Sequence, residues 1–202
     1  MYKQKDNSFY YIHIPRTGGR YVRELFKNSK DIESFYDSFE VARRHRAEVH
    51  LHYPLYEVEL PVAEIPHITI VRNPLERFES AMKVRFLRYD VDLNEMIKDK
   101  NMFEKFMAYQ LEVDCFYCNW FLPQYKYISE KTKIWKYEWG FGPDFFEWVK
   151  KHTGFEVSNP PENVETYTFN GDRNQKVNLS KNLQRWAKEF YKRDYEKFKY
   201  KL

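Results

Sequence analysis

The feature that most constrains the fold is the stretch FYYIHIPRTGGRYV, which begins at Phe9. Aromatic and β-branched residues fill the run up to Ile14, and that composition favours a buried strand. Gly18 and Gly19 end the strand and let the backbone approach a ligand closely. Apolar residues then recur at helical spacing. The stretch therefore predicts a strand, a loop and a helix in succession.

A loop of this kind is a candidate anion site. The first N–H groups of a helix lack intrahelical partners, and together with the helix dipole they point at whatever occupies the loop. Arg16 and Arg20 add positive charge there. A glycine pair alone is also typical of an ordinary strand-to-helix turn, so the interpretation needs support from elsewhere in the chain.

A second strand and helix follow between residues 67 and 88. The segment HITIV, ending at Val71, favours a buried strand, and Asn73 suits the N-cap of the next helix. Pro74 suits the first helical position, and Glu76 completes a capping-box-like pattern. Arg72 then follows the carboxyl end of a strand, where open α/β sheets bind their ligands.

Ser80 lies one to two turns into the same helix. An arginine at the strand end and a hydroxyl at that distance can hold one phosphate between them, so Arg72 and Ser80 are candidate ligand residues. Arg77 shares a helix side with Ser80. On its own, Arg77 is expected at the helix surface, in a salt bridge.

These units predict an α/β fold, with a central parallel sheet flanked by helices in a single domain over residues 1–202. Lys133 to Tyr137 is a further candidate strand. A short helix is expected from Pro143 to His152, and one long helix from Leu179 to Phe198, capped by Asn178 or Ser180. Residues 156–178 lack periodicity and are expected to form a long ordered loop.

The second strand end separates two nucleotide-binding schemes. A P-loop kinase needs a Lys-Ser/Thr pair in the first loop and an acidic residue after a later strand for Mg²⁺. Here the first loop lacks that pair, and Arg72 follows the second strand. Both differences favour an anion site without metal, which leaves the kinase as the weaker alternative.

The motifs PRTGG and VRNPLERFESA resemble those of the sulfotransferases that use 3′-phosphoadenosine 5′-phosphosulfate (PAPS), especially the heparan and chondroitin O-sulfotransferase branch. That branch typically shows IPKTGGTS in the loop for the 5′-phosphosulfate. It shows VR[DN]PxxRxxS in the element for the 3′-phosphate. In this chain Arg16 stands where the family has lysine, and Arg20 and Tyr21 replace small hydroxyl residues.

The resemblance implies transfer of a sulfuryl group from PAPS to an acceptor hydroxyl, expected on a carbohydrate, leaving adenosine 3′,5′-bisphosphate. It implies that the 5′-phosphosulfate is held by Arg16, Thr17, Gly18, Gly19, Arg20 and Tyr21. It also implies that Arg72 and Ser80 bind the 3′-phosphate, together with Lys176 from a late loop. Residues 119–127, NWFLPQYKY, resemble the family's P-Q-x-x-Y element.

Two histidines are candidates for the base that takes the acceptor's proton. The family places a histidine in a segment similar to the one in which His52 precedes Tyr53 and Pro54. His50 is the reserve candidate, because a two-residue step in an extended segment leaves both side chains on one face. The alternative from a different class is a non-catalytic protein that binds a nucleotide or an anionic glycan, and the replacements at Arg16 and Arg20 motivate it.

The remaining expectations come from composition. The net charge of +4, from 34 basic and 30 acidic residues, does not indicate a nucleic-acid partner and favours local basic sites for a small anion. A small-molecule or glycan acceptor is what the resemblance implies. Without an apolar run of about 18 residues, no membrane association is expected, and the expected location is cytoplasmic. Cys115 and Cys118 lack further ligands at zinc spacing, so no metal is expected.

Overall fold

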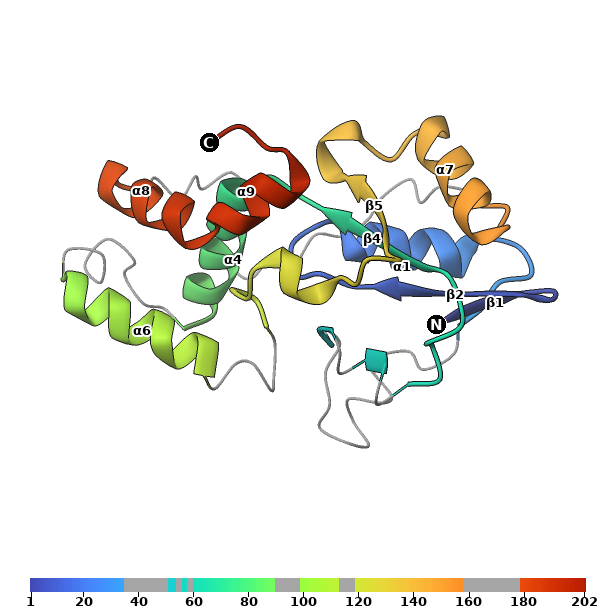
Figure 1. Cartoon of the computed structure of the whole chain (residues 1–202), viewed down its shortest axis with the longest axis horizontal. Coiled ribbons are helices and arrows are strands. Elements are labelled where there is room, and N and C mark those ends of the chain that lie inside the picture. The colour runs from blue at the N-terminus through green and yellow to red at the C-terminus, as the bar shows by residue number, and fades with distance from the viewer. Residues whose placement is uncertain (35–50, 54–55, 58–59, 90–98, 113–118, 158–178) are drawn as a thin grey trace.

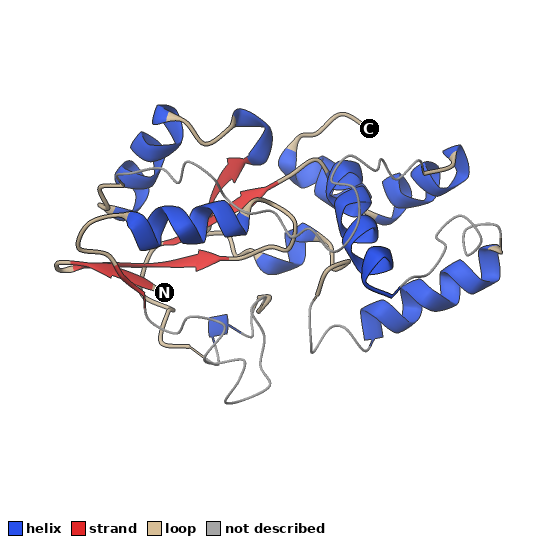
Figure 2. Cartoon of the chain, turned by 180° about the vertical axis from the view of Figure 1, so that it is seen from behind, coloured by secondary structure: helices blue, strands red, loops and turns tan. Residues whose placement is uncertain are grey.

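The computed structural model describes residues 1–34, 51–53, 56–57, 60–89, 99–112, 119–157 and 179–202. Within these ranges the strands form one five-stranded sheet in the order β3-β1-β2-β4-β5. The strands are β1 (Tyr2–Gln4), β2 (Asn7–Ile12), β3 (Glu33–Ser34), β4 (His67–Val71) and β5 (Lys133–Lys136). Figure 1 shows the sheet with helices around it, and Figure 2 shows the same arrangement from behind.

The α/β prediction is confirmed. β2, β4 and β5 run parallel, with Tyr10 opposite His67 and Ile68 opposite Lys133. The antiparallel edge was not anticipated: β1 pairs with β2 and β3 pairs with β1, both antiparallel. The sequence did not predict this edge because its N-terminal residues are polar. A strand at the border of a sheet does not need apolar residues on both faces, so it leaves no clear apolar pattern.

One face of the sheet is covered by α1 (Gly19–Asn28) and α7 (Pro143–Thr153). Side chains alternate along a strand, so Phe9 and Tyr11 of β2 point to this face. There they join Leu25 and Phe26 of α1, and Phe145 of α7. The predicted helix over 143–152 is therefore confirmed, and it ends at Gly154, which has a left-handed φ of 75°.

The other face carries Tyr10 and Ile12 of β2. It packs against Tyr56 and Val62, against the 3-10 helix η2 (Gln124–Tyr127) and against the end of α9 (Lys192–Phe198). The short 3-10 helix η3 (Tyr137–Trp139) follows β5 directly. Both faces of β4 are thus buried, as its unbroken apolar sequence predicts.

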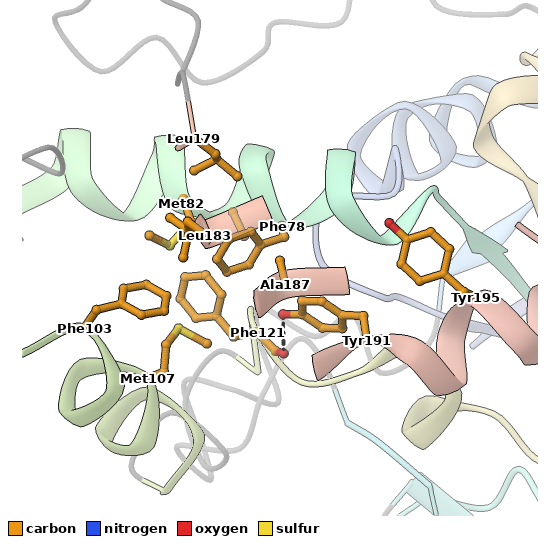
Figure 3. Close-up of a cluster of buried hydrophobic side chains, with 11 residues drawn as sticks. Phe78, Met82, Phe103, Met107, Phe121, Leu179, Leu183, Ala187, Tyr191 and Tyr195 are labelled. Atoms are coloured by element: carbon orange, nitrogen blue, oxygen red, sulfur yellow. Dashed lines mark hydrogen bonds between the residues drawn. The ribbon is translucent and has the colours of Figure 1, made fainter. Parts of the chain in front are cut away.

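A third hydrophobic cluster lies away from the sheet (Figure 3). It joins α4 (Pro74–Tyr89), α6 (Lys100–Glu112) and α8 (Lys181–Phe190). Phe78 and Met82 of α4 meet Phe103 and Met107 of α6 and Leu183 of α8. None of the helices in the described ranges is both long and apolar enough to cross a membrane.

The C-terminal segment is two helices where one was expected. Ser180 caps α8, as predicted, by accepting from the Leu183 N–H. The axis then changes at Tyr191, whose hydroxyl donates to the Phe121 carbonyl at 2.8 Å. The turn brings Asp194 under η2, where its carboxylate accepts from the N–H groups of Gln124 and Tyr125. These buried contacts override the continuous helical pattern of the sequence.

Candidate functional site

The loop after β2 leads into α1 through two left-handed residues. Arg16 has a φ of 69°, and Gly18, the N-cap of α1, has a φ of 90°. No side chain caps the first N–H groups of α1, which begin at Gly19. Thr17 turns its hydroxyl inward to the Ile14 carbonyl at 2.8 Å. The backbone at the start of α1 is therefore the part of this loop that suits an anion.

Gly19 is required by its contact with His13. A Cβ at Gly19 would lie 1.9 Å from Nε2 of His13, so a larger residue forces the imidazole to move. Burial lowers the pKa of His13 to about 4, and the nearby Arg23 and Arg16 charges act in the same direction. His13 is thus neutral at physiological pH. The sequence analysis gave His13 no role. Its position between a strand and a glycine loop was the feature that could have indicated one.

The backbone of Arg72 is fixed by the buried side chain of Gln124. The Gln124 amide accepts from the Arg72 N–H at 2.9 Å and donates to the Arg72 carbonyl at 2.8 Å. This explains the glutamine of the P-Q-x-x-Y element. The predicted cap is also present, since the Asn73 side chain accepts from the N–H groups of Leu75 and Glu76.

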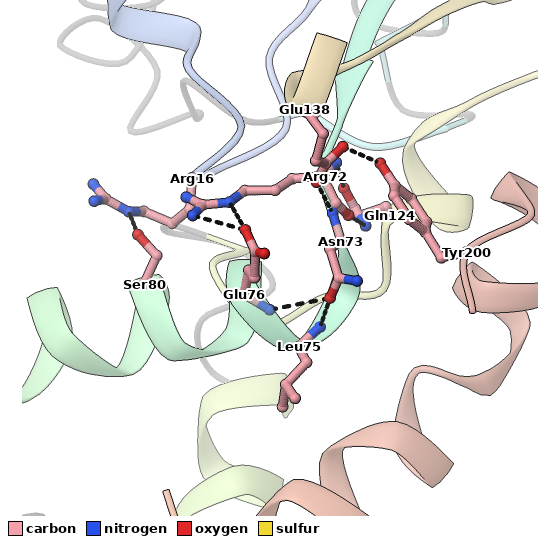
Figure 4. A network of polar contacts seen from close by, with 9 residues as sticks. All are labelled: Arg16, Arg72, Asn73, Leu75, Glu76, Ser80, Gln124, Glu138 and Tyr200. Atoms are coloured by element: carbon pink, nitrogen blue, oxygen red, sulfur yellow. Dashed lines mark hydrogen bonds and ion pairs between the residues drawn. The ribbon is translucent and has the colours of Figure 1, made fainter. Parts of the chain in front are cut away.

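Glu138 and the C-terminal tail complete this strand end. One carboxylate oxygen of Glu138 accepts from the Asn73 N–H at 2.6 Å. The other accepts from the Tyr200 hydroxyl at 2.8 Å. Figure 4 shows these contacts beside the arginines.

The two predicted anion elements meet directly. Nε of Arg16 donates to the hydroxyl of Ser80 at 2.9 Å, across 64 positions of sequence (Figure 4). Burial, together with the charges of Arg72 and Arg20, lowers the pKa of Arg16 to about 10. Arg16 therefore remains charged at neutral pH, and guanidinium groups of like charge gather at one place. Such a cluster suits a ligand with several negative charges.

Arg72 contacts a carboxylate and an aromatic ring. Its guanidinium donates to Glu76 at 3.2 and 3.3 Å and lies 4.6 Å from the centre of the Tyr137 ring. Tyr137 and Phe141 also bound the glycine loop, because a Cβ at Gly18 would lie 2.7 Å from Phe141. Tyr21 stacks on Phe141 and donates its hydroxyl to that residue's carbonyl. The sequence assigned no role to Phe141.

Arg77 is not at the helix surface, as its helical position alone suggested, but is fully buried. Its Nε donates to the Pro15 carbonyl at 3.1 Å, and Nη2 donates to the carbonyls of Trp120 and Leu122. It therefore joins the loop after β2 to the segment before η2. The sequence could not show this, because the partners are backbone atoms of distant segments.

His52 lies on a separate segment that packs beside η2. Its Nδ1 is 3.3 Å from the amide nitrogen Nδ2 of Asn119, and the backbone N–H of Tyr53 donates to the Lys126 carbonyl. Burial lowers the pKa of His52, and the charge of Lys126 acts the same way. The imidazole is thus neutral at pH 7. Asn119 is followed by Trp120, whose carbonyl accepts from Arg77.

Some candidates lie outside the described residues: His50, Lys176, Cys115 and Cys118. Among the residues that the structure does describe, no cluster of histidine, cysteine, aspartate or glutamate has the makings of a metal site.

The arrangement agrees with a comparison against known protein families. The chain matches the model described as "Sulfotransferase family" over residues 1–201. No curated protein and no solved structure gives a significant match. Because the family match covers nearly the whole chain, the protein belongs to the sulfotransferase family.

Proposed function

We propose that this protein transfers a sulfuryl group from PAPS to an acceptor hydroxyl on a carbohydrate. The family supports sulfuryl transfer in general. The observation that carries the finer proposal is the contact between Arg16 and Ser80, which unites the two motifs expected to hold the two phosphate-bearing ends of the donor. Three guanidinium groups beside uncapped N–H groups fit such a polyanion.

Each half of the donor has its own residues in this proposal. Arg16, Arg20 and the backbone from Thr17 to Tyr21 hold the 5′-phosphosulfate. Arg72 and Ser80 hold the 3′-phosphate, and Lys176 joins them. When bound, PAPS supplies a sulfuryl group whose sulfur–oxygen bond to the 5′-phosphate breaks, leaving the electron pair on the phosphate oxygen.

The protein's own groups then manage protons and charge. His52 takes the proton of the acceptor hydroxyl while that oxygen bonds to sulfur, and His50 is the reserve candidate. Arg16 and the first N–H groups of α1 stabilise the negative charge that develops on the leaving oxygen. The neutral state of His52 at pH 7 supports its role as a base.

The test combines calorimetry with a transfer assay. Adenosine 3′,5′-bisphosphate should bind wild-type protein at least about 10-fold more tightly than adenosine 5′-monophosphate, since it adds one charged phosphate contact. His52→Ala should abolish transfer of radiolabelled sulfate from PAPS and leave this binding intact. The matched control is His152→Ala, which alters a histidine on α7.

The outcomes separate the classes of function. Transfer retained in His52→Ala would remove His52 from the role of base. Binding of PAPS without transfer across a broad panel of glycans would support the non-catalytic binding protein instead. Activity with ATP and Mg²⁺, but none with PAPS, would favour the kinase.

A further inference from the structure

A phenylalanine ring covers the loop after β2 at the residue where α1 begins. Gly18 is the N-cap of α1, and a Cβ built on it would lie 2.7 Å from Cζ of Phe141. The Phe141 ring is therefore in van der Waals contact with the backbone at this N-cap.

A second ring reaches from this N-cap to the other half of the site. Cε2 of Tyr137 would lie 3.2 Å from the same Cβ, and the Arg72 guanidinium lies 4.6 Å from the centre of the Tyr137 ring. The rings of Tyr137 and Phe141 meet edge-on, with their centres 5.6 Å apart. Together they form an apolar wall between the start of α1 and the arginine proposed to bind the 3′-phosphate.

Tyr21 supports the Phe141 ring from α1. The two rings stack with their centres 4.7 Å apart and an interplanar angle of 24°. The Tyr21 hydroxyl also donates to the Phe141 carbonyl at 3.2 Å. The sulfotransferase pattern has a small hydroxyl residue at this position, which could not stack on a ring. The support for Phe141 is therefore a feature of this chain's own sequence.

The turn that carries Phe141 is fixed on both sides. The Gly140 carbonyl accepts from the indole N–H of Trp135 at 2.9 Å. The Gly142 carbonyl accepts from the N–H of Phe145 at 3.0 Å, and the buried Phe145 ring lies edge-on to the Phe141 ring, 5.2 Å between centres. Because backbone and ring are both held, the Phe141 side chain keeps its place beside the loop.

This placement matters because no side chain caps the first N–H groups of α1. Such groups are satisfied by water or by a ligand. A ring beside them limits the approach of water and lowers the local polarity, which strengthens their attraction for an anion. A reactive group bound there is also protected from water that would compete with the acceptor.

We propose that Phe141, supported by Tyr21, shields the start of α1 from water and so directs the sulfuryl group to the acceptor hydroxyl. This inference rests on the proposed function. The reaction that the shield suppresses is hydrolysis of PAPS. In that reaction a water oxygen bonds to sulfur, and the sulfur–oxygen bond to the 5′-phosphate breaks with its electron pair left on the phosphate oxygen. Both protons of the water pass to solvent, and sulfate and adenosine 3′,5′-bisphosphate are released.

The first test measures amide hydrogen exchange by NMR in the full chain without any donor. In Phe141→Ala the amides of Gly19 and Arg20 should exchange about 10-fold faster than in the wild-type protein, because water then reaches them more often. The matched control is Phe146→Ala, which removes a ring that α7 packs on the same hydrophobic cluster. It should leave these two exchange rates unchanged.

Wild-type exchange rates in Phe141→Ala, or equal acceleration in Phe141→Ala and Phe146→Ala, would overturn the proposal. This readout needs no sulfuryl transfer, so its failure is distinct from a failure of the proposed function.

The second test measures the release of radiolabelled sulfate from PAPS without any acceptor. Release should be about 10-fold faster in Phe141→Ala than in the wild-type protein and should stay at the wild-type rate in Phe146→Ala. Phe141→Leu keeps an apolar side chain and should lie between the two. Tyr21→Ser removes the stacked ring and should raise the rate about 3-fold.

Sulfate release at the wild-type rate in a Phe141→Ala protein that still binds PAPS would contradict the shielding role. If the wild-type chain binds neither PAPS nor adenosine 3′,5′-bisphosphate, the proposed function fails. The exchange rates of Gly19 and Arg20 then decide by themselves whether Phe141 shields the start of α1.

Discussion

The Arg16 guanidinium donates to the Ser80 hydroxyl at 2.9 Å, so the loop after β2 and the helix after β4 meet through side chains. These segments follow adjacent parallel strands, and their carboxyl ends lie at the same edge of the sheet. The contact holds a long cationic side chain in place before any ligand arrives.

The first prediction concerns this contact. Ser80→Ala removes both the acceptor for Arg16 and a hydroxyl proposed to bind phosphate. We expect the affinity for adenosine 3′,5′-bisphosphate to fall about 10-fold, the typical effect of one hydrogen bond to a charged group. Calorimetry measures it. Ser180→Ala is the matched control: it removes the N-cap of α8, costs about 1 kcal/mol of stability, and should leave the affinity unchanged.

The second prediction concerns Glu76, whose carboxylate occupies the fork of Arg72. An incoming phosphate must compete with that carboxylate for the same N–H groups. Glu76→Gln should therefore tighten binding of adenosine 3′,5′-bisphosphate by about 2- to 5-fold, in keeping with the modest strength of a partly exposed ion pair. The gain should shrink in high salt. Weaker binding in this variant would show that Glu76 orients Arg72 rather than competing for it.

The third prediction concerns Arg77. Arg77→Lys keeps the charge but cannot reproduce a planar fork that reaches the carbonyls of two segments. We expect the free energy of unfolding in urea to fall by about 3 kcal/mol. Arg23→Lys alters an exposed arginine on α1 and should change it by less than about 0.5 kcal/mol. Equal stability of the two variants would refute the structural role of Arg77.

The fourth prediction tests the packing of His13 on Gly19. Gly19→Ala forces the imidazole to move, and overpacking of this kind costs about 1–3 kcal/mol. His13→Ala opens space, so in the double variant most of the Gly19→Ala penalty should disappear. Gly142→Ala is the control, since no atom lies within 4 Å of a Cβ built there. Additive losses in the double variant would contradict the contact.

The fifth prediction follows from the pKa of His13, which lies near 4 in the folded chain and near 6.5 in an unfolded one. As the pH falls below about 6.5, the unfolded chain binds a proton that the folded protein resists, so stability declines until about pH 4. In His13→Asn, the drop in the free energy of unfolding over this pH range should be smaller by about 1–3 kcal/mol. The measurement compares urea midpoints at pH 7 and pH 4.5. The other histidines remain in the variant, so the difference isolates His13.

The sequence anticipated the parts of the site that depend on local chemistry. Asn73 caps α4 because an asparagine side chain reaches its own helix, and Gly18 stands at the N-cap of α1 because the left-handed φ of 90° there suits glycine. Contacts between distant segments were not readable in this way. The contacts of Gln124 and Asn119 depend on backbone atoms and rings that the fold alone brings near.

The break between α8 and α9 at Tyr191 is a second feature that the sequence alone did not predict. Helical periodicity runs through that residue, and its sequence neighbours give no stop signal. The helix axis turns because Tyr191 and Asp194 satisfy backbone groups of the 119–125 segment. Tertiary bonds of this kind outweigh local propensity.

The burial of Arg77 has a consequence for reading the VRNPLERFES motif in other chains. Its two arginines and its serine serve different ends: Arg77 ties backbone segments together, and Arg72 and Ser80 belong to the ligand site we propose. A chain that lost Arg72 and Ser80 would therefore keep the buried contacts of Arg77 and with them the fold. Arg77 in this motif reports on architecture, and only the outer pair bears on the proposed 3′-phosphate site.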